Sequence, residues 1–149
     1  MKYDRILKLY NMKLFITAFS FLLSLSVFGQ NVYIPDANFK AYLVGNTTIN
    51  TNGDSEIQVS EAVAFGGEIS CDNLSISDLT GIEAFTALES LRCYTNQLTS
   101  LDVTQNTSLE FLRCANNQLT SLDVTQNTSL EVLWCGGNPL NSLDVTQNT

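Results

Sequence analysis

The chain has 149 residues, with 7 Lys or Arg, 15 Asp or Glu and no His, so its net charge at neutral pH is −8. This acidic balance, without a basic stripe, makes nucleic acid and anionic membrane surfaces poor partners. Because His is absent, sites in which His activates a Ser or Cys nucleophile are excluded, and a common metal ligand is missing.

Residues 1–29 are expected to be a signal peptide. Four basic residues within the first 13 precede an apolar run over residues 14–28, and Gly29 supplies the small residue that signal peptidase requires. The run is shorter than the ~20 residues of a membrane-spanning helix, and a membrane anchor is the alternative. We expect a secreted or outer-surface mature chain with no membrane span, carrying 3 basic and 14 acidic residues.

Residues 30–68 are expected to form a helical N-terminal cap. Pro35 and Asp36 begin a short helix, in which Phe39, Tyr42 and Leu43 fall on one apolar face. A second short helix is expected over residues 60–65, followed by a first strand over residues 69–71. The second half of the chain is an array of repeats, described below, and such an array needs a cap at its end. The alternative for the first helix is an exposed helix that binds a partner.

The loop over residues 50–61 has the spacing of a calcium-binding loop. Its sequence, NTNGDSEIQVSE, is similar to D-x-[DN]-x-[DN]-G-x5-E. The candidate ligands for a weak Ca²⁺ site, the one cofactor that the sequence suggests, are Asn50, Asn52, Asp54, Glu56 and Glu61. The first ligand is not Asp and the sixth place is Ser55 rather than Gly, so the affinity would be low. The alternative is a loop without metal, in which Ser60 caps the next helix.

The second half of the chain repeats one unit with a period of 21 residues. Copies begin at Leu98, Leu119 and Leu140, and a divergent copy covers residues 76–97. The pattern L-x-x-L-x-C-x-x-N-x-L recurs in phase. Self-similarity at such a period is typical of a solenoid, in which stacked coils share one core.

This pattern resembles the leucine-rich repeat over residues 69–149, with Cys in place of the third Leu. The segments IPDANFKAYL and ISDLTGIEAF are similar to secreted leucine-rich-repeat proteins of Bacteroidetes-type bacteria. We therefore expect a strand-dominated solenoid of the α/β class, with a parallel β-sheet on the concave face and a mostly irregular or extended convex side. The resemblance implies recognition rather than catalysis.

The cysteines recur once per coil, at Cys71, Cys93, Cys114 and Cys135. They occupy the place of a buried Leu, and Cys behaves as a small hydrophobe. We expect free buried thiols. Disulfides between neighbouring coils are the alternative, and a straight column does not provide the tetrahedral cluster that a four-Cys zinc site needs.

Two polar side chains also recur at the repeat spacing. Asn96, Asn117 and Asn138 are expected to bond backbone groups where the chain leaves each strand. The acidic column is Asp102, Asp123 and Asp144. We expect these carboxylates to accept bonds from backbone N–H groups and hydroxyls such as that of Thr104, and a cation between them is the alternative.

Outward positions on the strands place aromatic and basic residues together. The candidate binding residues are Arg92, Tyr94, Phe111, Arg113 and Trp134. These residue types are enriched in interface hot spots, although they could instead pack against one another. We predict a secreted or surface binding module, not an enzyme, that recognises a protein or a glycan through the concave face.

Three alternatives to this function stay open. They are a structural spacer, a truncated fragment of a longer surface protein, and a glycan-active enzyme that uses two carboxylates. The last copy stops at Thr149, within a repeat. We therefore expect an uncapped C-terminal coil through which the chain could self-associate.

Overall fold

The structure, a computed structural model, describes residues 29–148. Residues 1–28, which hold most of the predicted signal peptide, lie outside the described residues, as does Thr149. The segment Asn31–Thr149 groups into one compact unit. Within residues 29–148, no helix is both long and apolar enough to cross a membrane.

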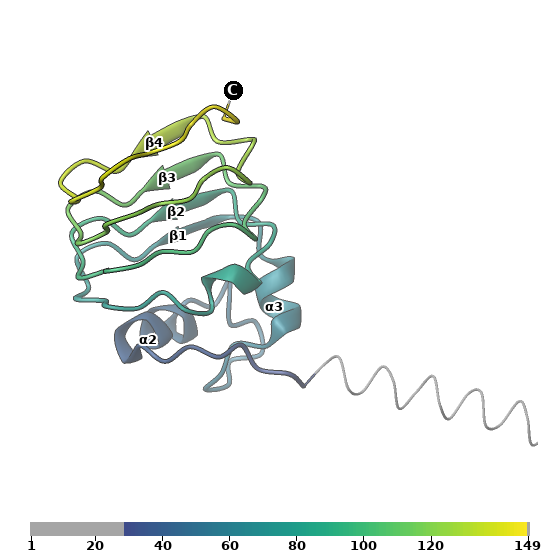
Figure 1. The fold of residues 1–149 in the computed structure, drawn as a ribbon. Helices are drawn as coiled ribbons and strands as arrows, with labels where there is room; N and C mark the ends of the chain where they lie inside the picture. The colour runs from purple at the N-terminus through teal and green to yellow at the C-terminus, as the bar shows by residue number, and fades with distance from the viewer. Residues whose placement is uncertain (1–28, 149) are drawn as a thin grey trace, which may run out of the picture. The chain divides into compact units, whose positions relative to one another are not determined.

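The described chain alternates short strands with longer connections (Figure 1). Its elements are α2 (Ala37–Gly45), α3 (Val59–Ala64), β1 (Glu68–Ser70), the 3-10 turn η1 (Ile82–Ala84), β2 (Ser90–Arg92), β3 (Phe111–Arg113) and β4 (Val132–Trp134). The strands form one parallel sheet in the order β1-β2-β3-β4. The two helices lie at the β1 end of the stack (Figure 1). This is the predicted leucine-rich-repeat solenoid.

The register of the sheet aligns equivalent residues of successive coils. Leu91 pairs with Leu112, and Leu112 pairs with Leu133. This register stacks the Leu side chains in one column. Leu91 and Leu112 are fully buried, so the column faces the core, and side chains alternate between the two faces of a strand. The residues on either side of each Leu therefore point away from the core, onto a surface that we call the open sheet face.

Each coil returns along the opposite side, which we call the return face. In the two regular copies the return segments contain no helix, as expected for a sequence rich in Val, Thr and Asn. Leu98, Val103 and Leu109 of one return are fully buried. They join a single core that continues into the cap through Phe39 and Leu43, so the cap shields the first coil from water.

Asparagine side chains tie the coils together. Asn117 donates from Nδ2 to the carbonyls of Cys93 and Cys114, each at 3.0 Å, and accepts from the Leu98 amide at 3.0 Å. Asn96 and Asn138 repeat this arrangement. The predicted ladder is confirmed, and it satisfies backbone groups that are turned away from water.

A second ladder runs along the return face. Asn127 is fully buried and donates to the carbonyls of Val103 at 2.9 Å and Asn106 at 2.8 Å. Asn106 and Asn148 make equivalent bonds. Each coil is thus bonded to the preceding coil at two corners as well as through the sheet.

Asp36 joins the cap to the first coil. Its Oδ1 accepts from the amides of Asn38 and Phe39 and so caps α2, while its Oδ2 accepts from the amide and hydroxyl of Ser77. Gly81 (φ 105) adds a close contact, because a Cβ there would lie 2.8 Å from Ile34. Residues far apart in the sequence are therefore held together at this junction.

Two predicted boundaries in the cap were wrong. Helix α3 begins at Val59 rather than residue 60, and its N-cap is Gln58, which forms a capping box with Glu61, rather than Ser60. Strand β1 begins at Glu68, one residue earlier than expected, because Glu68 pairs with Ser90 in the register of the sheet. The shift of β1 follows from long-range pairing with β2, whereas that of α3 follows from a local capping box in which Gln rather than Ser is the N-cap.

Candidate ligand-binding site

The open sheet face brings two arginines and a tryptophan into one row. Arg92 pairs with Arg113, and Arg113 pairs with Trp134, across β2, β3 and β4. The Arg113 guanidinium carbon lies 4.5 Å from the centre of the Trp134 ring. The corresponding carbon of Arg92 lies 5.7 Å from the centre of the Tyr94 ring. The predicted column therefore exists, and each cation faces an aromatic ring.

The two arginines differ in their acidic neighbours. The guanidinium nitrogens of Arg92 lie 3.7 Å from a carboxylate oxygen of Glu68 and 3.7 Å from one of Asp72. Arg113 forms no ion pair with any residue in the described part of the chain. Glu68 and Asp72 were not predicted as neighbours of Arg92. The repeat spacing carried a signal for Glu68, because it lies one coil before Ser90, at the start of β2.

A hollow of about 350 Å³ lies beside Arg113 on the open sheet face. Three of its seven lining residues are acidic, and the lining consists of Gly67, Glu68, Glu89, Ser90, Glu110, Phe111 and Arg113. Phe111 is half-buried and Trp134 is 58% exposed. The structure thus places Phe111 and Arg113 on β3, with Trp134 on the following strand and Arg92 on the preceding one. The binding role of these residues stays a prediction.

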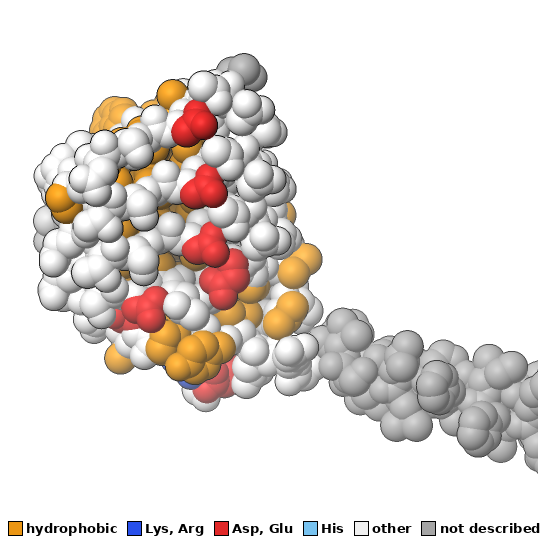
Figure 2. All heavy atoms as spheres, viewed as in Figure 1, with side chains coloured by type: hydrophobic (Ala, Val, Ile, Leu, Met, Phe, Trp, Pro, Cys, Tyr) orange, Lys and Arg blue, Asp and Glu red, His pale blue; other side chains and the backbone are white. Residues whose placement is uncertain are grey.

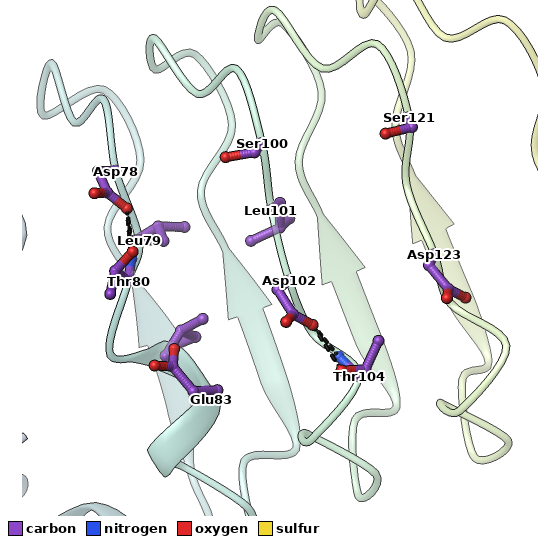
Figure 3. A pocket seen from close by; sticks show the side chains of 11 residues that line it. Asp78, Leu79, Thr80, Glu83, Ser100, Leu101, Asp102, Thr104, Ser121 and Asp123 are labelled. Carbon is purple, nitrogen blue, oxygen red and sulfur yellow. Dashed lines mark hydrogen bonds between the residues drawn. The ribbon is translucent and has the colours of Figure 1, made fainter.

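The return face carries a larger hollow of about 410 Å³. In Figure 3, Asp78, Asp102 and Asp123 lie on successive coils along it, and Figure 2 shows acidic side chains in a column on the face in view. The D-x-T spacing, which also occurs at Asp78, could have revealed this first member of the column.

The carboxylates of this column are bonded within their own turns, as predicted. Asp123 accepts from the amide and hydroxyl of Thr125 at 2.9 and 2.7 Å, and Asp102 does the same with Thr104. These bonds lower the pKa of Asp123 below its ordinary value. A general acid needs a raised pKa, so Asp123 is not suited to that role.

The predicted calcium loop is held by its own hydrogen bonds. Asn50 is buried, and its Nδ2 donates to the carbonyls of Val44 at 3.0 Å and Asp54 at 2.8 Å. Asn52 donates to the carboxylate of Asp54 at 3.1 Å and to Gln58 at 2.6 Å. These contacts account for the fold of the loop without a metal ion.

The remaining candidate ligands also have protein partners. Glu61 accepts from the amides of Thr51, Asn52 and Gln58, and Glu56 is paired with Lys40 at 2.7 Å. Across residues 29–148, no group of three or more His, Cys, Asp or Glu side chains is arranged to hold a metal ion. Calcium binding stays a prediction.

The four cysteines form the expected column in the core. Cys71, Cys93 and Cys114 are buried, Cys135 is half-buried, and all four are free thiols. Burial raises the pKa of Cys71 and of Cys114 to about 12. These thiols therefore remain protonated at neutral pH and act as packing groups.

Comparison with known proteins places this geometry among leucine-rich repeats. Residues 107–147 match a family model described as leucine-rich repeats in two copies. The chain is 41% identical to internalin J of Listeria monocytogenes serotype 4b (strain F2365) over 78 residues, which cover 52% of this chain and 8% of internalin J. This chain therefore spans only a small part of that relative.

Two solved structures show the same fold. The functional domain of InlJ from Listeria monocytogenes, described as including a cysteine ladder, superimposes with a TM-score of 0.70 and 40% identity, covering 80% of this chain and 26% of that chain. Internalin InlF from Listeria monocytogenes strain 4b F2365 gives a TM-score of 0.64 at 19% identity, covering 76% and 33%. The latter likeness concerns the fold alone.

Proposed function

We propose that this leucine-rich-repeat protein, which is related to the internalins of Listeria, is a non-catalytic binding module. It holds a protein or a glycan on the open sheet face. Solenoids present extended surfaces of this kind to their partners. The N-terminal signal-peptide pattern supports a secreted or outer-surface location.

The observation that carries this proposal is the pairing of Arg113 with Trp134. Trp134 exposes 58% of its surface beside a cation that has no acidic partner among the described residues. A large exposed indole next to an arginine has the composition of an interface hot spot. A purely structural spacer has no need of this pair, because Trp134 contributes little to the core.

A catalytic role is not supported by the acidic groups. The acids of the return face are bonded to threonines of their own turns, and the pKa of Asp144, like that of Asp123, is lowered by these bonds. Neither carboxyl therefore has the raised pKa that a glycosidase acid requires.

The binding proposal is tested by screening the full chain against a glycan array and a display library of random peptides. Captured ligands are then measured by biolayer interferometry on Trp134→Ala, with the exposed return-face variant Gln105→Ala as the control. We expect Trp134→Ala to weaken binding at least about tenfold and Gln105→Ala to leave it unchanged. Equal affinity of Trp134→Ala and the unaltered chain would contradict the proposed surface.

A further inference from the structure

Two arginines at the same position of adjacent coils are in different electrostatic states. Arg92 lies 3.7 Å from Glu68 and 3.7 Å from Asp72, so its charge is balanced within the chain. Arg113, directly beside it in the register, has no acidic partner among residues 29–148. The repeat therefore presents one balanced and one unbalanced cation on the same surface.

The Nε atom of Arg113 is buried without an acceptor among the described residues, and so is that of Arg92. The missing acidic partner, rather than this buried atom, therefore distinguishes Arg113 from Arg92. The Trp134 ring, 4.5 Å from the guanidinium carbon, holds the planar group in one orientation, and a fixed guanidinium is suited to bind a carboxylate.

The acids around Arg113 restrict which carboxylate ligand fits. Glu68, Glu89 and Glu110 line the same hollow as Arg113, and the chain as a whole is acidic. Like charges repel at this range, so a polyanion such as an acidic polysaccharide is disfavoured. A ligand with a single carboxylate and a net neutral or basic charge would gain the contact with Arg113 without this repulsion.

From this geometry we infer that the open sheet face binds a protein segment with one Asp or Glu side chain, seated on Arg113, and an apolar neighbour that covers Trp134. The segment is otherwise neutral or basic. This inference rests on the proposed function and names the chemistry of its ligand. Phe111, which lines the hollow with Arg113, extends the apolar contact to the next strand.

The test uses the full chain and a display library of random peptides. Peptides retained by the unaltered chain are sequenced, synthesised with their acidic residue intact or replaced by its amide, and measured on four proteins. These are the unaltered chain, Arg113→Gln, Trp134→Ala and Lys40→Gln. Lys40→Gln is the control, because it removes one positive charge from the cap, outside the open sheet face. Oligogalacturonate is the polyanionic glycan probe.

We expect the amide peptide to bind the unaltered chain at least about tenfold more weakly than the acid peptide. On Arg113→Gln the two peptides should bind alike, whereas Lys40→Gln should still distinguish them. Circular dichroism melting of each variant shows that it is folded.

Other outcomes overturn the inference. Peptides that lose affinity on Trp134→Ala but do not distinguish acid from amide would leave the proposed surface standing and reject the carboxylate contact. A preference for oligogalacturonate would reject the protein segment in favour of a glycan. Retention of all peptides by Trp134→Ala and Arg113→Gln, or no peptide or oligogalacturonate binding at all, would reject both proposals together.

Discussion

The amide of Ser70 donates a hydrogen bond of 2.8 Å to the hydroxyl of Tyr42. Ser70 ends β1, the outermost strand on the cap side of the sheet, and Tyr42 lies in helix α2. An edge strand presents unpaired backbone donors that invite pairing with another chain. The cap therefore covers the apolar core and also supplies a hydrogen-bond acceptor to the Ser70 amide at the edge of the sheet.

Tyr42→Phe removes only this acceptor and should lower the free energy of unfolding by about 1 kcal/mol. Urea denaturation followed by circular dichroism measures the change. Tyr33→Phe is the matched control, because Tyr33 is 75% exposed and its variant should unfold like the unaltered chain. An equal effect of both substitutions would refute the role of the Tyr42 hydroxyl.

Asn117→Ala should destabilise the array by about 1–3 kcal/mol, because it leaves the buried amide of Leu98 without an acceptor. It also removes one of the two donors to the carbonyls of Cys93 and Cys114, which keep only their bonds from Asn96 and Asn138. The neighbouring Gln118 is exposed, and Gln118→Ala serves as the control in the same denaturation experiment. A loss below about 1 kcal/mol for Asn117→Ala would mean that water replaces the ladder.

Thr95→Asn should stabilise the protein by about 0.5–1 kcal/mol. Thr95 has φ 56, a left-handed conformation. The residues at the equivalent position of the other coils adopt it too, and they are Asn73, Asn116 and Gly137. This conformation is costly for a β-branched residue and tolerated by Asn. Thermal and urea unfolding should both show the gain, whereas the exposed Thr99→Asn should show none. A destabilised Thr95→Asn would contradict the strain argument.

Stability should fall steeply at alkaline pH. Burial raises the pKa of Cys71 and Cys114 to about 12 and that of Cys93 well above its ordinary value, whereas unfolded thiols ionise near about pH 8.5. Between these values the folded state keeps protons that the unfolded state has lost. The free energy of unfolding therefore decreases by up to about 1.4 kcal/mol per pH unit for each thiol.

Urea midpoints between about pH 9 and pH 11 would measure this slope. Burial also raises the pKa of Tyr42, which adds to the fall above about pH 10. Cys114→Ala should reduce the slope while lowering stability at neutral pH, because it removes one titrating group and part of the core packing. The same slope with and without Cys114 would show that buried thiols do not cause it.

The predicted calcium loop can be tested by thermal unfolding. If Ca²⁺ binds the loop, millimolar CaCl2 should raise the melting temperature above that in EDTA, and Asp54→Asn should remove the difference. Because Glu61 already accepts from the amides of Thr51, Asn52 and Gln58, Glu61→Gln should destabilise the cap even in EDTA. Identical melting with and without calcium would reject the calcium proposal and leave the capping role of Glu61.

The repeat itself made most of the fold predictable. The in-phase positions of Leu91, Leu112 and Leu133 indicated both the parallel register and the inward face, and Asn117 indicated the ladder. Each follows from a local rule applied once per coil: side chains alternate along a strand, and buried backbone groups need partners. Burial of the cysteine column followed in the same way, because Cys replaced a core Leu.

Tertiary contacts decided what differs between coils. That Arg92 is neutralised while Arg113 is not depends on Glu68 and Asp72, which belong to the irregular first coil. Likewise, the start of β1 was set by the pairing of Glu68 with Ser90, which lies 22 residues later. The repeated sequence determines the features that all coils share, such as the register and the buried face. The charge balance of a single side chain depends on residues that only folding brings close to it.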